Sequence, residues 1–542
     1  MQKYWKSGDP FVWLTGGALA LSVLMIAGLV VVILVNGLQQ FWPSDVVELH
    51  LKHDRKVLGE IWNREIIPQH GMKPGGKQQF RLRLKIGNRD IYSLDFKWVD
   101  EKDIEKKSFP ENALVLERME WGNFYGMFKA LKVDDKIVAT NWADARQALQ
   151  SYLPAAHTLH KKIDRIEKDD IGGINYRLEA LRLRLRSIQL QSKDAADAGE
   201  VSNIQAKMKV LQHDYKQKEA ALGRLYEQSK KVVLVMNSID GQVKTIKVFD
   251  IVRLYAPNTM NVFQKAGLYA GKVWEFVSGE PRESNTEGGI FPAIFGTVML
   301  VVIMSIAVVP LGVLAAVYLR EYAKQGLWVR AIRIAVNNLA GVPSIVYGIF
   351  GLGFFIYTIG GTIDKLFYAE ALPTPTFGTG GILWASLTLA LLTVPVVIVA
   401  TEEGLAAVPR AVREGSMALS ATKFETLWRV VLPGAMPGIL TGLILAIARA
   451  AGEVAPLMIT GVVKLAPSLP LDGYFPFLHL ERKFMHLGFH IYDVGFQSPN
   501  VEAALPMVYS TTLLLLVIVV LLNVIAIIVR NRMRKKIAYS VF

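Results

Sequence analysis

The sequence predicts a mainly α-helical membrane protein with six transmembrane helices and an inserted α+β domain. Hydrophobic residues make up 52% of its 542 residues and charged residues only 20%, a composition that excludes a disordered or nucleic-acid-coating chain. Six apolar runs are each long enough to cross a bilayer, and alternating and heptad patterns occupy the long segment after the first run. We therefore expect three parts: residues 1–41 with the first helix, an outer segment 42–288, and residues 289–542 with the other five helices.

The first apolar run, Phe11 to Phe41, contains no Asp, Glu, Lys, Arg or His. It exceeds the roughly 20 residues that cross a bilayer, whereas the apolar core of a cleaved signal peptide has only about 7–15. No small-x-small cleavage motif follows it. The aromatic pair of Phe41 and Trp42 suits the interfacial belt at the outer end of a helix. We therefore expect a retained transmembrane helix rather than a signal peptide.

Five further apolar runs lie late in the chain, at about 291–319, 334–358, 380–401, 433–461 and 505–529. The 320–333 loop carries four basic residues and one acid, and the end of the chain after the last run carries five basic residues and no acid. Loop 359–378 instead holds two acids and one lysine. Because positive charge accumulates on the cytoplasmic side, we expect both termini and the 320–333 and 402–432 loops in the cytoplasm. The segment 42–288 then lies outside the inner membrane, in the periplasm.

The outer segment begins and ends with patterns typical of β-hairpins. Apolar and basic residues alternate over 79–86, and a second alternation follows a turn, so 79–99 is predicted as a hairpin. Two valine-rich stretches, 232–235 and 243–248, flank Asp240–Gly241, which predicts a hairpin with a two-residue loop. The net charge of +14 is shared between this segment and the flanks of the apolar runs, without a basic stripe that would predict a nucleic-acid partner.

From about 158 to 230 the apolar residues instead repeat in heptads. The polar stretch Gln191–Glu200 interrupts them, which predicts an antiparallel helical-hairpin coiled coil with its tip there. Lys218 occupies one of the core positions. Two interpretations stay open. The hairpin is either a stalk that only projects from the membrane or a docking platform for an external partner, and heptads do not name that partner.

No catalytic motif is recognisable. Neither Gly-Lys pair is followed by the Ser or Thr of a phosphate-binding P-loop, and there is no nucleophile elbow and no HExxH. The chain has no cysteine, so disulfides, thiolate metal sites and cysteine nucleophiles are excluded. Two histidine pairs without a third ligand are interpreted as surface histidines rather than metal sites; they are His157 with His160 and His486 with His490. We therefore expect a protein that is not an enzyme, with no catalytic residue, cofactor or metal.

The fifth apolar run contains two charged residues, Arg449 and Glu453, four positions apart and therefore on one face of a helix. An arginine at the centre of a bilayer costs roughly 2.5–3.5 kcal/mol on insertion scales, so its side chain must face protein or water. One interpretation is an anion pathway in which Arg449 attracts the substrate and Glu453 orients the guanidinium. The other is a self-neutralising pair that only locks helix packing.

In the 402–432 loop, Glu414, Gly415, Ser416 and Ser420 are followed by Leu432 and Pro433. This pattern resembles the EAA loop of ABC importer permeases, and in that family the loop contacts the ATPase. Against that pattern Gly415 and Ser416 replace two alanines, and Ser420 replaces a glycine. The matching residues are Glu414, Gly415, Ser416, Ser420, Leu432 and Pro433. A simple solvated loop is the alternative interpretation.

Longer strings at 309–323, 338–353 and 432–458 are similar to the PstA family, permeases of the phosphate importer, with the sister PstC family as the alternative. The likeness covers roughly 289–542 and the first helix, and Val454 stands where the family has threonine. It implies a six-span type I importer permease without an ATP site of its own. Its implied partners are a PstC-like permease subunit, a cytoplasmic ATPase dimer that grips the loop of Glu414, and a periplasmic phosphate-binding protein.

The resemblance also implies that Arg449 and Glu453 occupy the charged positions implicated in phosphate passage. It assigns no role to 42–288, which is far longer than in the short family form. Two other functions remain as alternatives: a permease for another oxyanion such as sulfate or molybdate, and a membrane-anchored scaffold or receptor that works through the coiled coil.

Overall fold

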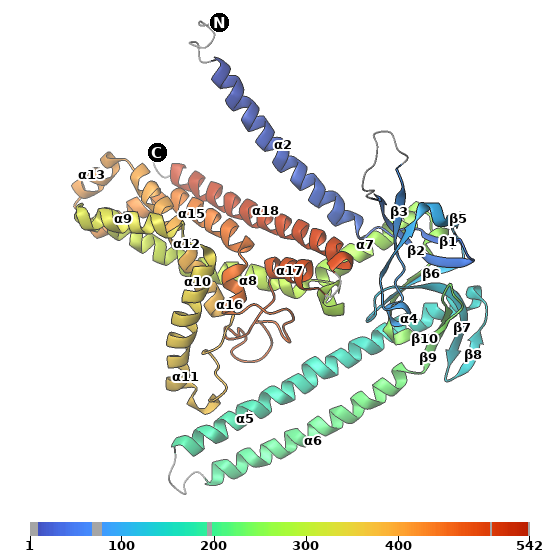
Figure 1. Cartoon of the computed structure of the whole chain (residues 1–542). Helices are drawn as coiled ribbons and strands as arrows, with labels where there is room; N and C mark the ends of the chain where they lie inside the picture. The colour runs from blue at the N-terminus through green and yellow to red at the C-terminus, as the bar shows by residue number, and fades with distance from the viewer. Residues whose placement is uncertain (1–8, 68–77, 192–197, 499–500, 540–542) are drawn as a thin grey trace. The chain divides into compact units, whose positions relative to one another are not determined.

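The computed structural model describes residues 9–67, 78–191, 198–498 and 501–539. The chain divides into two compact units (Figure 1). The helical unit comprises Met1–Gln40, Phe276–Tyr368 and Leu372–Phe542, and the α+β unit comprises Phe41–Glu275 and Ala369–Ala371. Each is described by itself below.

Within the described residues, six helical segments are long and apolar enough to cross a membrane, as the sequence predicted. They are Phe11–Gln39, Phe291–Tyr322, Ser344–Phe367, Ile382–Ala407, Lys423–Gly452 and Val501–Lys535. The helices that build them are α2 (Asp9–Gln39), α8 (Phe291–Val317), α10 (Ser344–Phe350), α11 (Gly361–Phe367), α12 (Ile382–Ala407), α14 (Lys423–Thr426), α15 (Leu432–Gly452) and α18 (Val501–Tyr539). Shorter helices of this unit are α9 (Leu327–Leu339), α13 (Arg410–Ala418), α16 (Ala455–Thr460) and α17 (Leu487–Tyr492).

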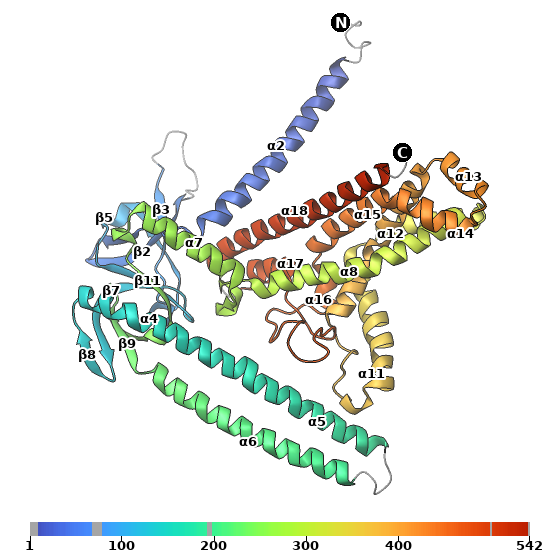
Figure 2. The same cartoon turned by 180° about the vertical axis from the view of Figure 1, so that it is seen from behind.

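The core of the helical unit forms where α12 packs against α8 and α15 (Figure 2). Glycines allow the close approach of α12 and α15: a Cβ added at Gly438 would lie 2.5 Å from the Cα of Gly404. Helix α2 contacts α18, where the Ser510 hydroxyl donates to the Gly37 carbonyl at 2.7 Å. The helices thus meet mainly through small residues and apolar side chains, as expected of a membrane bundle.

Two predicted span boundaries are wrong, and a proline explains the first of them. The third span was placed at 334–358, but α9 ends at Leu339 and the membrane-length helix starts at Ser344. Pro343 lacks an amide hydrogen and forces the residue before it out of the α conformation, so the helix breaks there. The fifth helix was expected over 433–461, but it begins at Lys423 and ends at Gly452.

The predicted loop 402–432 is therefore mostly helical. Its first residues belong to α12, and its end runs into α15 through η10 (Leu427–Val431), a π-helical turn. Pro433 cannot donate to a carbonyl one turn earlier, and π-helical turns commonly accommodate such an interruption.

The α+β unit contains two antiparallel sheets. The first has the strand order β4-β3-β2-β1-β5, from β1 (Val46–Leu51), β2 (Arg55–Ile66), β3 (Phe80–Lys85), β4 (Phe96–Asp100) and β5 (Ile104–Ser108). The second has the order β10-β9-β7-β6-β11, and β8 also pairs with β7. Its strands are β6 (Ala113–Arg118), β7 (Phe124–Val133), β8 (Lys136–Ala139), β9 (Val232–Asn237), β10 (Val243–Lys247) and β11 (Ile251–Tyr255).

Both predicted hairpins are present, although their connections differ from the prediction. Strands β3 and β4 pair with Leu84 opposite Lys97, and a short helix, α3 (Arg89–Tyr92), lies in the connection between them. Strands β9 and β10 pair from Asn237 opposite Val243, so five residues connect them rather than two. Ser238 closes this longer loop, because its amide donates to the Gln242 carbonyl at 2.9 Å.

The predicted helical hairpin is formed by α5 (Gly172–Gln191) and α6 (Ala198–Ser229), which lie side by side in both views. Helix α4 (Trp142–Arg165) leads into α5 through the π-helical turn η2 (Ile166–Ile171), so the first arm starts earlier than expected. Heptad residues Ile174, Ile188 and Ile204 are buried. Lys218 is neutralised by Asp170, with Nζ 2.6 Å from Oδ2. The predicted tip falls largely outside the described residues.

Candidate functional site

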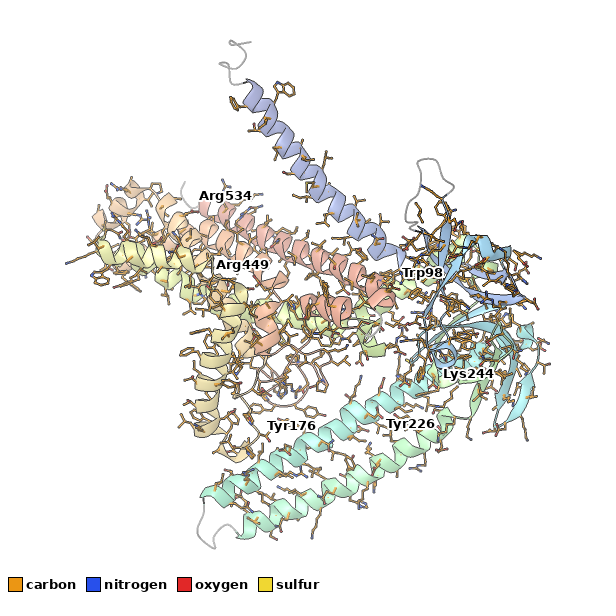
Figure 3. All side chains as sticks on the ribbon, viewed as in Figure 1. Trp98, Tyr176, Tyr226, Lys244, Arg449 and Arg534 are labelled. Carbon is orange, nitrogen blue, oxygen red and sulfur yellow. The ribbon has the colours of Figure 1, made fainter. Side chains whose placement is uncertain are left out.

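The charged pair of the fifth span lies at the end of a helix rather than in the middle of one. Arg449 is in the last turn of α15 (Figure 3), and Glu453 is the residue that caps it, in an extended conformation. The prediction that both belong to one continuous helix is wrong, because the helix ends at Gly452. The side chains still face each other, with Arg449 Nε 3.7 Å from Glu453 Oε1. That distance is an ion-pair contact, longer than a hydrogen bond.

The Arg449 guanidinium has spare donors. Its Nη2 makes a long hydrogen bond of 3.5 Å to the carbonyl of Ala340, and 31% of the side chain is exposed. In the described part of the chain, no hydrogen bond or ion pair involves its Nη1. A cation in the last turn of a helix is also favoured by the helix dipole. Arg449 is thus held in place with donors that remain available to an anion.

The break between α9 and α10 lies beside Arg449. Ala340 belongs to this break, and Tyr347 closes over it by donating its hydroxyl to the Leu339 carbonyl at 2.7 Å. Tyr347 is only 5% exposed. The pair therefore sits between the end of α15 and the break that separates α9 from α10, where the Ala340 carbonyl lies next to the guanidinium.

Four of the residues matched to the EAA pattern, Glu414, Gly415, Ser416 and Ser420, lie on α13 and the turn that follows it. Glu414 and Gly415 are exposed on α13, and the Ser416 hydroxyl is 3.0 Å from that of Thr426. Ser420 has a φ of +66°, the left-handed conformation for which glycine is best suited. The sharp turn is therefore made although the glycine of the pattern is absent. Leu432 and Pro433 form the first turn of α15, as part of a continuous helix.

Side-chain contacts that were not predicted from the sequence attach this segment to the second span. Arg413 on α13 bonds Glu321, with Nη1 2.6 Å from Oε1, and also donates to the Leu405 carbonyl at 2.5 Å. Lys423 bonds the backbone carbonyl of Glu321. Opposite charges on the segments 320–333 and 402–432 were the available signal. These bonds join α13 and α14 to the end of α8.

Large apolar side chains surround the exposed Glu414 segment. Phe424 and Trp428 are each 63% exposed, and their rings stack at 6.3 Å between centroids. Met417 and Leu419 are also exposed. Such a patch beside a carboxylate is typical of a surface that another protein covers.

The histidines of the last third of the chain are not on the surface, contrary to prediction. His486 and His490 are 0% and 2% exposed, and burial lowers their pKa values to about 3 and about 4. Both rings are therefore neutral at physiological pH. His157, by contrast, is exposed, with Nε2 3.3 Å from the Ile251 carbonyl. Among the described residues, no group of three His, Asp or Glu is arranged to hold a metal.

Comparison with known proteins shows which family this chain resembles. Residues 308–538 match the family model described as "Binding-protein-dependent transport system inner membrane component". The probable ABC transporter permease protein YqgI of Bacillus subtilis (strain 168) is 30% identical over 237 residues, which are 42% of this chain and 74% of that protein. Apart from Ala369–Ala371, the α+β unit lies outside the matched family model.

Several relatives are phosphate permeases by name. The phosphate transport system permease protein PstA 1 of Mycobacterium tuberculosis (strain CDC 1551 / Oshkosh) is 39% identical over 187 residues, 34% of this chain and 55% of that protein. PstA of Yersinia pestis is 35% identical over 188 residues, 34% of this chain and 57% of that protein. The chain thus spans about half the length of these relatives. Among solved structures, a chain of the inward-facing MetNI methionine ABC transporter has 17% identity and a TM-score of 0.31, covering 49% of this chain and 97% of that one; this score is too low to carry an argument.

Proposed function

Because the chain belongs to the family of binding-protein-dependent transport system inner membrane components, we propose that it moves inorganic phosphate across the inner membrane. As a permease component of an ABC transporter it lacks an ATPase site, and it is a multi-pass membrane protein. ATP hydrolysis then resides on partner subunits and drives alternating access of the permease. The substrate follows from PstA relatives that share about a third of the chain.

The observation that carries the proposal is Arg449, a membrane-span arginine with spare donors. Orthophosphate at neutral pH is an anion, and a guanidinium offers it two parallel N–H donors. Glu453 lies close enough to hold the guanidinium in position, yet at 3.7 Å it does not saturate its donors. The end of α15 at Gly452 and the break between α9 and α10 add backbone polar groups to the path. Arg449 and Glu453 are therefore our candidate pathway residues.

The second part of the proposal concerns coupling to ATP hydrolysis. Glu414, Gly415, Ser416 and Ser420 form the surface that an ATPase dimer grips, with the exposed Phe424–Trp428 stack beside it. The bonds of Arg413 and Lys423 to Glu321 transmit motion of this surface to α8. Leu432 and Pro433 transmit it to α15 through the continuous helix.

The proposed assembly has the type I importer architecture. A PstC-like permease completes the pathway, and a periplasmic phosphate-binding protein delivers the substrate. Both termini and the coupling segment face the cytoplasm, and residues 42–288 form a periplasmic insertion with the helical-hairpin coiled coil. This orientation rests on the distribution of basic residues between the spans.

Substrate competition tests the proposal. Cells that produce the chain with its partner subunits are starved of phosphate, and uptake of radiolabelled phosphate is measured with an excess of unlabelled phosphate, sulfate or molybdate. We expect only unlabelled phosphate to suppress uptake. Suppression by sulfate or molybdate to the same extent would assign the permease to another oxyanion.

One observation favours a second candidate function. The α5–α6 hairpin and the two sheets lie outside the family model, and a permease of this family does not need them. The chain would then act as a membrane-anchored scaffold or receptor through its coiled coil. If removal of the hairpin abolished a signalling output while phosphate uptake stayed normal, this function would be supported.

A further inference from the structure

Helix α7 (Val262–Ser278) departs from the pattern of an ordinary surface helix. Its charged side chains are half-buried, whereas Phe263 is 89% exposed and Trp274 is 72% exposed. A helix on a water-exposed surface normally turns its apolar stripe to the core and its charges to solvent. The exposed side of α7 therefore suits a medium that is not water.

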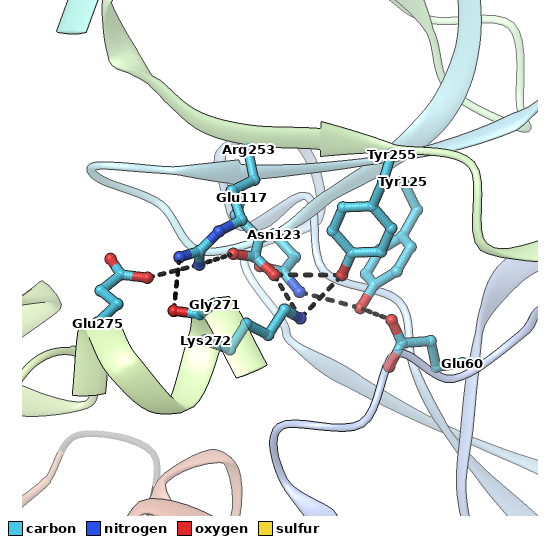
Figure 4. A network of polar contacts seen from close by, with 9 residues as sticks. All are labelled: Glu60, Glu117, Asn123, Tyr125, Arg253, Tyr255, Gly271, Lys272 and Glu275. Carbon is cyan, nitrogen blue, oxygen red and sulfur yellow. Dashed lines mark hydrogen bonds and ion pairs between the residues drawn. The ribbon is translucent and has the colours of Figure 1, made fainter. Parts of the chain in front are cut away.

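The inner side of α7 is fixed to the second sheet by a network of charges (Figure 4). Lys272 Nζ lies 2.5 Å from Glu117 Oε1, and Arg253 Nη1 lies 3.1 Å from Glu117 Oε2 and 2.5 Å from Glu275 Oε2. These cations hold the pKa of Glu117 at about 2 despite burial, and the Tyr255 hydroxyl donates to its Oε1 at 3.2 Å. These contacts join α7 to β6 and β11 and thereby set the orientation of α7 on the unit.

The other contacts of α7 go to the segment that follows the first transmembrane helix. Lys265 Nζ is 2.5 Å from Asp45 Oδ1, and the Tyr269 ring lies 6.3 Å from that of Phe41 and 6.0 Å from that of Trp42. Phe41 and Trp42 follow directly after the end of α2. Tyr269, in the middle of α7, thus contacts the two aromatic residues that follow the first transmembrane helix.

The outward stripe of α7 carries no charge. Residues 263, 267, 270 and 274 lie three or four positions apart, on one face of the helix. They are Phe263, Gly267, Ala270 and Trp274, and all four are exposed. A bulky aromatic residue at each end with small residues between makes a flat apolar surface. Trp42, 42% exposed, lies next to it beside Tyr269.

We propose that this stripe lies on the lipid bilayer, in the interface between the headgroups and the acyl chains of the outer leaflet. Amphipathic helices bind there with their apolar face buried about 5–10 Å into the boundary, and Trp concentrates at that level. The position follows from α7's contacts with Phe41 and Trp42 at the end of a span, and the orientation follows from the buried charges. The α+β unit then rests on the membrane through α7.

Spin labelling of the full-length chain in phospholipid vesicles tests this inference. The chain has no cysteine, so Phe263→Cys and Ala270→Cys each introduce a single labelling site without disturbing a buried side chain. The control is Ile137→Cys on β8, an apolar residue of the same unit that is 59% exposed. The measured quantities are the collision rates of each nitroxide with oxygen, which partitions into lipid, and with a water-soluble nickel chelate.

We expect collisions with the nickel chelate to be about fivefold less frequent at positions 263 and 270 than at 137, and collisions with oxygen to be more frequent. Equal nickel collisions at all three positions would mean that α7 faces water, which overturns the inference. Protection from both reagents would mean that a protein covers the stripe, which overturns it as well. The two α7 positions check each other, because a local distortion by one label does not affect the other.

Discussion

At the scale of single residues, the candidate site depends on two departures from regular helix. Arg449 keeps spare donors because α15 ends three residues later and its capping residue, Glu453, approaches only to 3.7 Å. Ser420 turns the chain after α13 with a left-handed backbone. In both places a backbone irregularity, rather than a side-chain motif alone, sets the geometry.

Ser420→Gly should stabilise the turn after α13 by about 1 kcal/mol, since a residue with a Cβ pays roughly that cost in the left-handed region. Hydrogen exchange of the amides of 416–422 in the full-length chain should slow about fivefold, the factor that this free energy represents. Ser420→Ala is the matched control, because it removes the hydroxyl but keeps the Cβ. Equal exchange in the glycine and alanine variants would show that backbone strain is not what Ser420 contributes.

At the scale of elements, α13 is exposed but firmly attached. Its Arg413 reaches Glu321, which lies in the turn directly after α8, while Glu414 remains exposed. The same element thus joins a rigid attachment to a free carboxylate, which is what a lever for a partner subunit requires.

Glu414→Lys should leave the chain in the membrane but abolish phosphate uptake, because it reverses the charge of a residue in the proposed contact with the ATPase. Membrane abundance, co-purification of the ATPase and uptake are measured together. Glu120→Lys, a reversal at another exposed position, serves as the control and should transport normally. Normal ATPase assembly with normal uptake in the Glu414→Lys variant would contradict the coupling role.

The element α7 also depends on charge, through Glu117. Because its folded-state pKa of about 2 is below the ordinary 4.5, ionised Glu117 stabilises the unit at neutral pH, and this stabilisation is lost as pH falls from about 4.5 towards 2. Glu117→Gln should therefore lower the free energy of unfolding by about 3 kcal/mol at pH 7, since it leaves buried cations without their partner.

The difference in free energy of unfolding between Glu117→Gln and the unmodified chain should shrink as the pH falls below 4.5. Thermal unfolding of the detergent-solubilised protein at a series of pH values measures it. Glu105→Gln, at an exposed position of the same unit, should show no pH-dependent difference. A Glu117→Gln effect of the same size at pH 7 and pH 3 would mean that the side chain acts through packing rather than charge.

At the scale of the whole molecule, the family likeness and the α+β unit concern different parts of the chain. The family model covers residues 308–538, which lie in the helical unit apart from Ala369–Ala371, and the α5–α6 hairpin belongs to the other unit. The two functions proposed for the chain can therefore be separated by experiment.

Removing one heptad from each arm of the hairpin, residues 178–184 and 205–211, should shorten it by about 10 Å while keeping the heptad pattern. If the hairpin is a docking platform, association with a soluble periplasmic partner weakens and phosphate uptake is unchanged. Unchanged co-purification of every partner would reduce the hairpin to a spacer.

Patterns that depend on near neighbours in sequence were predictable. The six spans, the β3–β4 hairpin and the heptads of α5 and α6 each follow from a local period. The network of Glu117, Arg253 and Lys272 was not, because its members are far apart in sequence and no local signal joins them. The burial of the histidine pair was missed for the same reason.

The contact between Arg449 and Glu453 was predictable from the sequence, but the backbone around it was not. A charged pair in an apolar run identifies Arg449 and Glu453, since such charges are costly in a membrane. The helix end at Gly452 and the contact with Ala340 depend on how α9, α10 and α15 pack. From the sequence spacing alone, Glu453 was expected inside the helix, whereas it is the first residue after the end of α15.

The most direct test of the central claim is phosphate uptake by an Arg449→Gln variant. Radiolabelled phosphate uptake is measured in phosphate-starved cells at matched membrane abundance, together with assembly of the complex. Arg530→Gln is the control, since Arg530 is another membrane-helix arginine, bonded at 3.3 Å to the Thr441 hydroxyl. We predict that Arg449→Gln lowers uptake at least about tenfold in an assembled complex, through loss of its charged donors to phosphate, while Arg530→Gln transports normally. Undiminished uptake by Arg449→Gln would contradict the account and leave the Arg449–Glu453 pair with a packing role only.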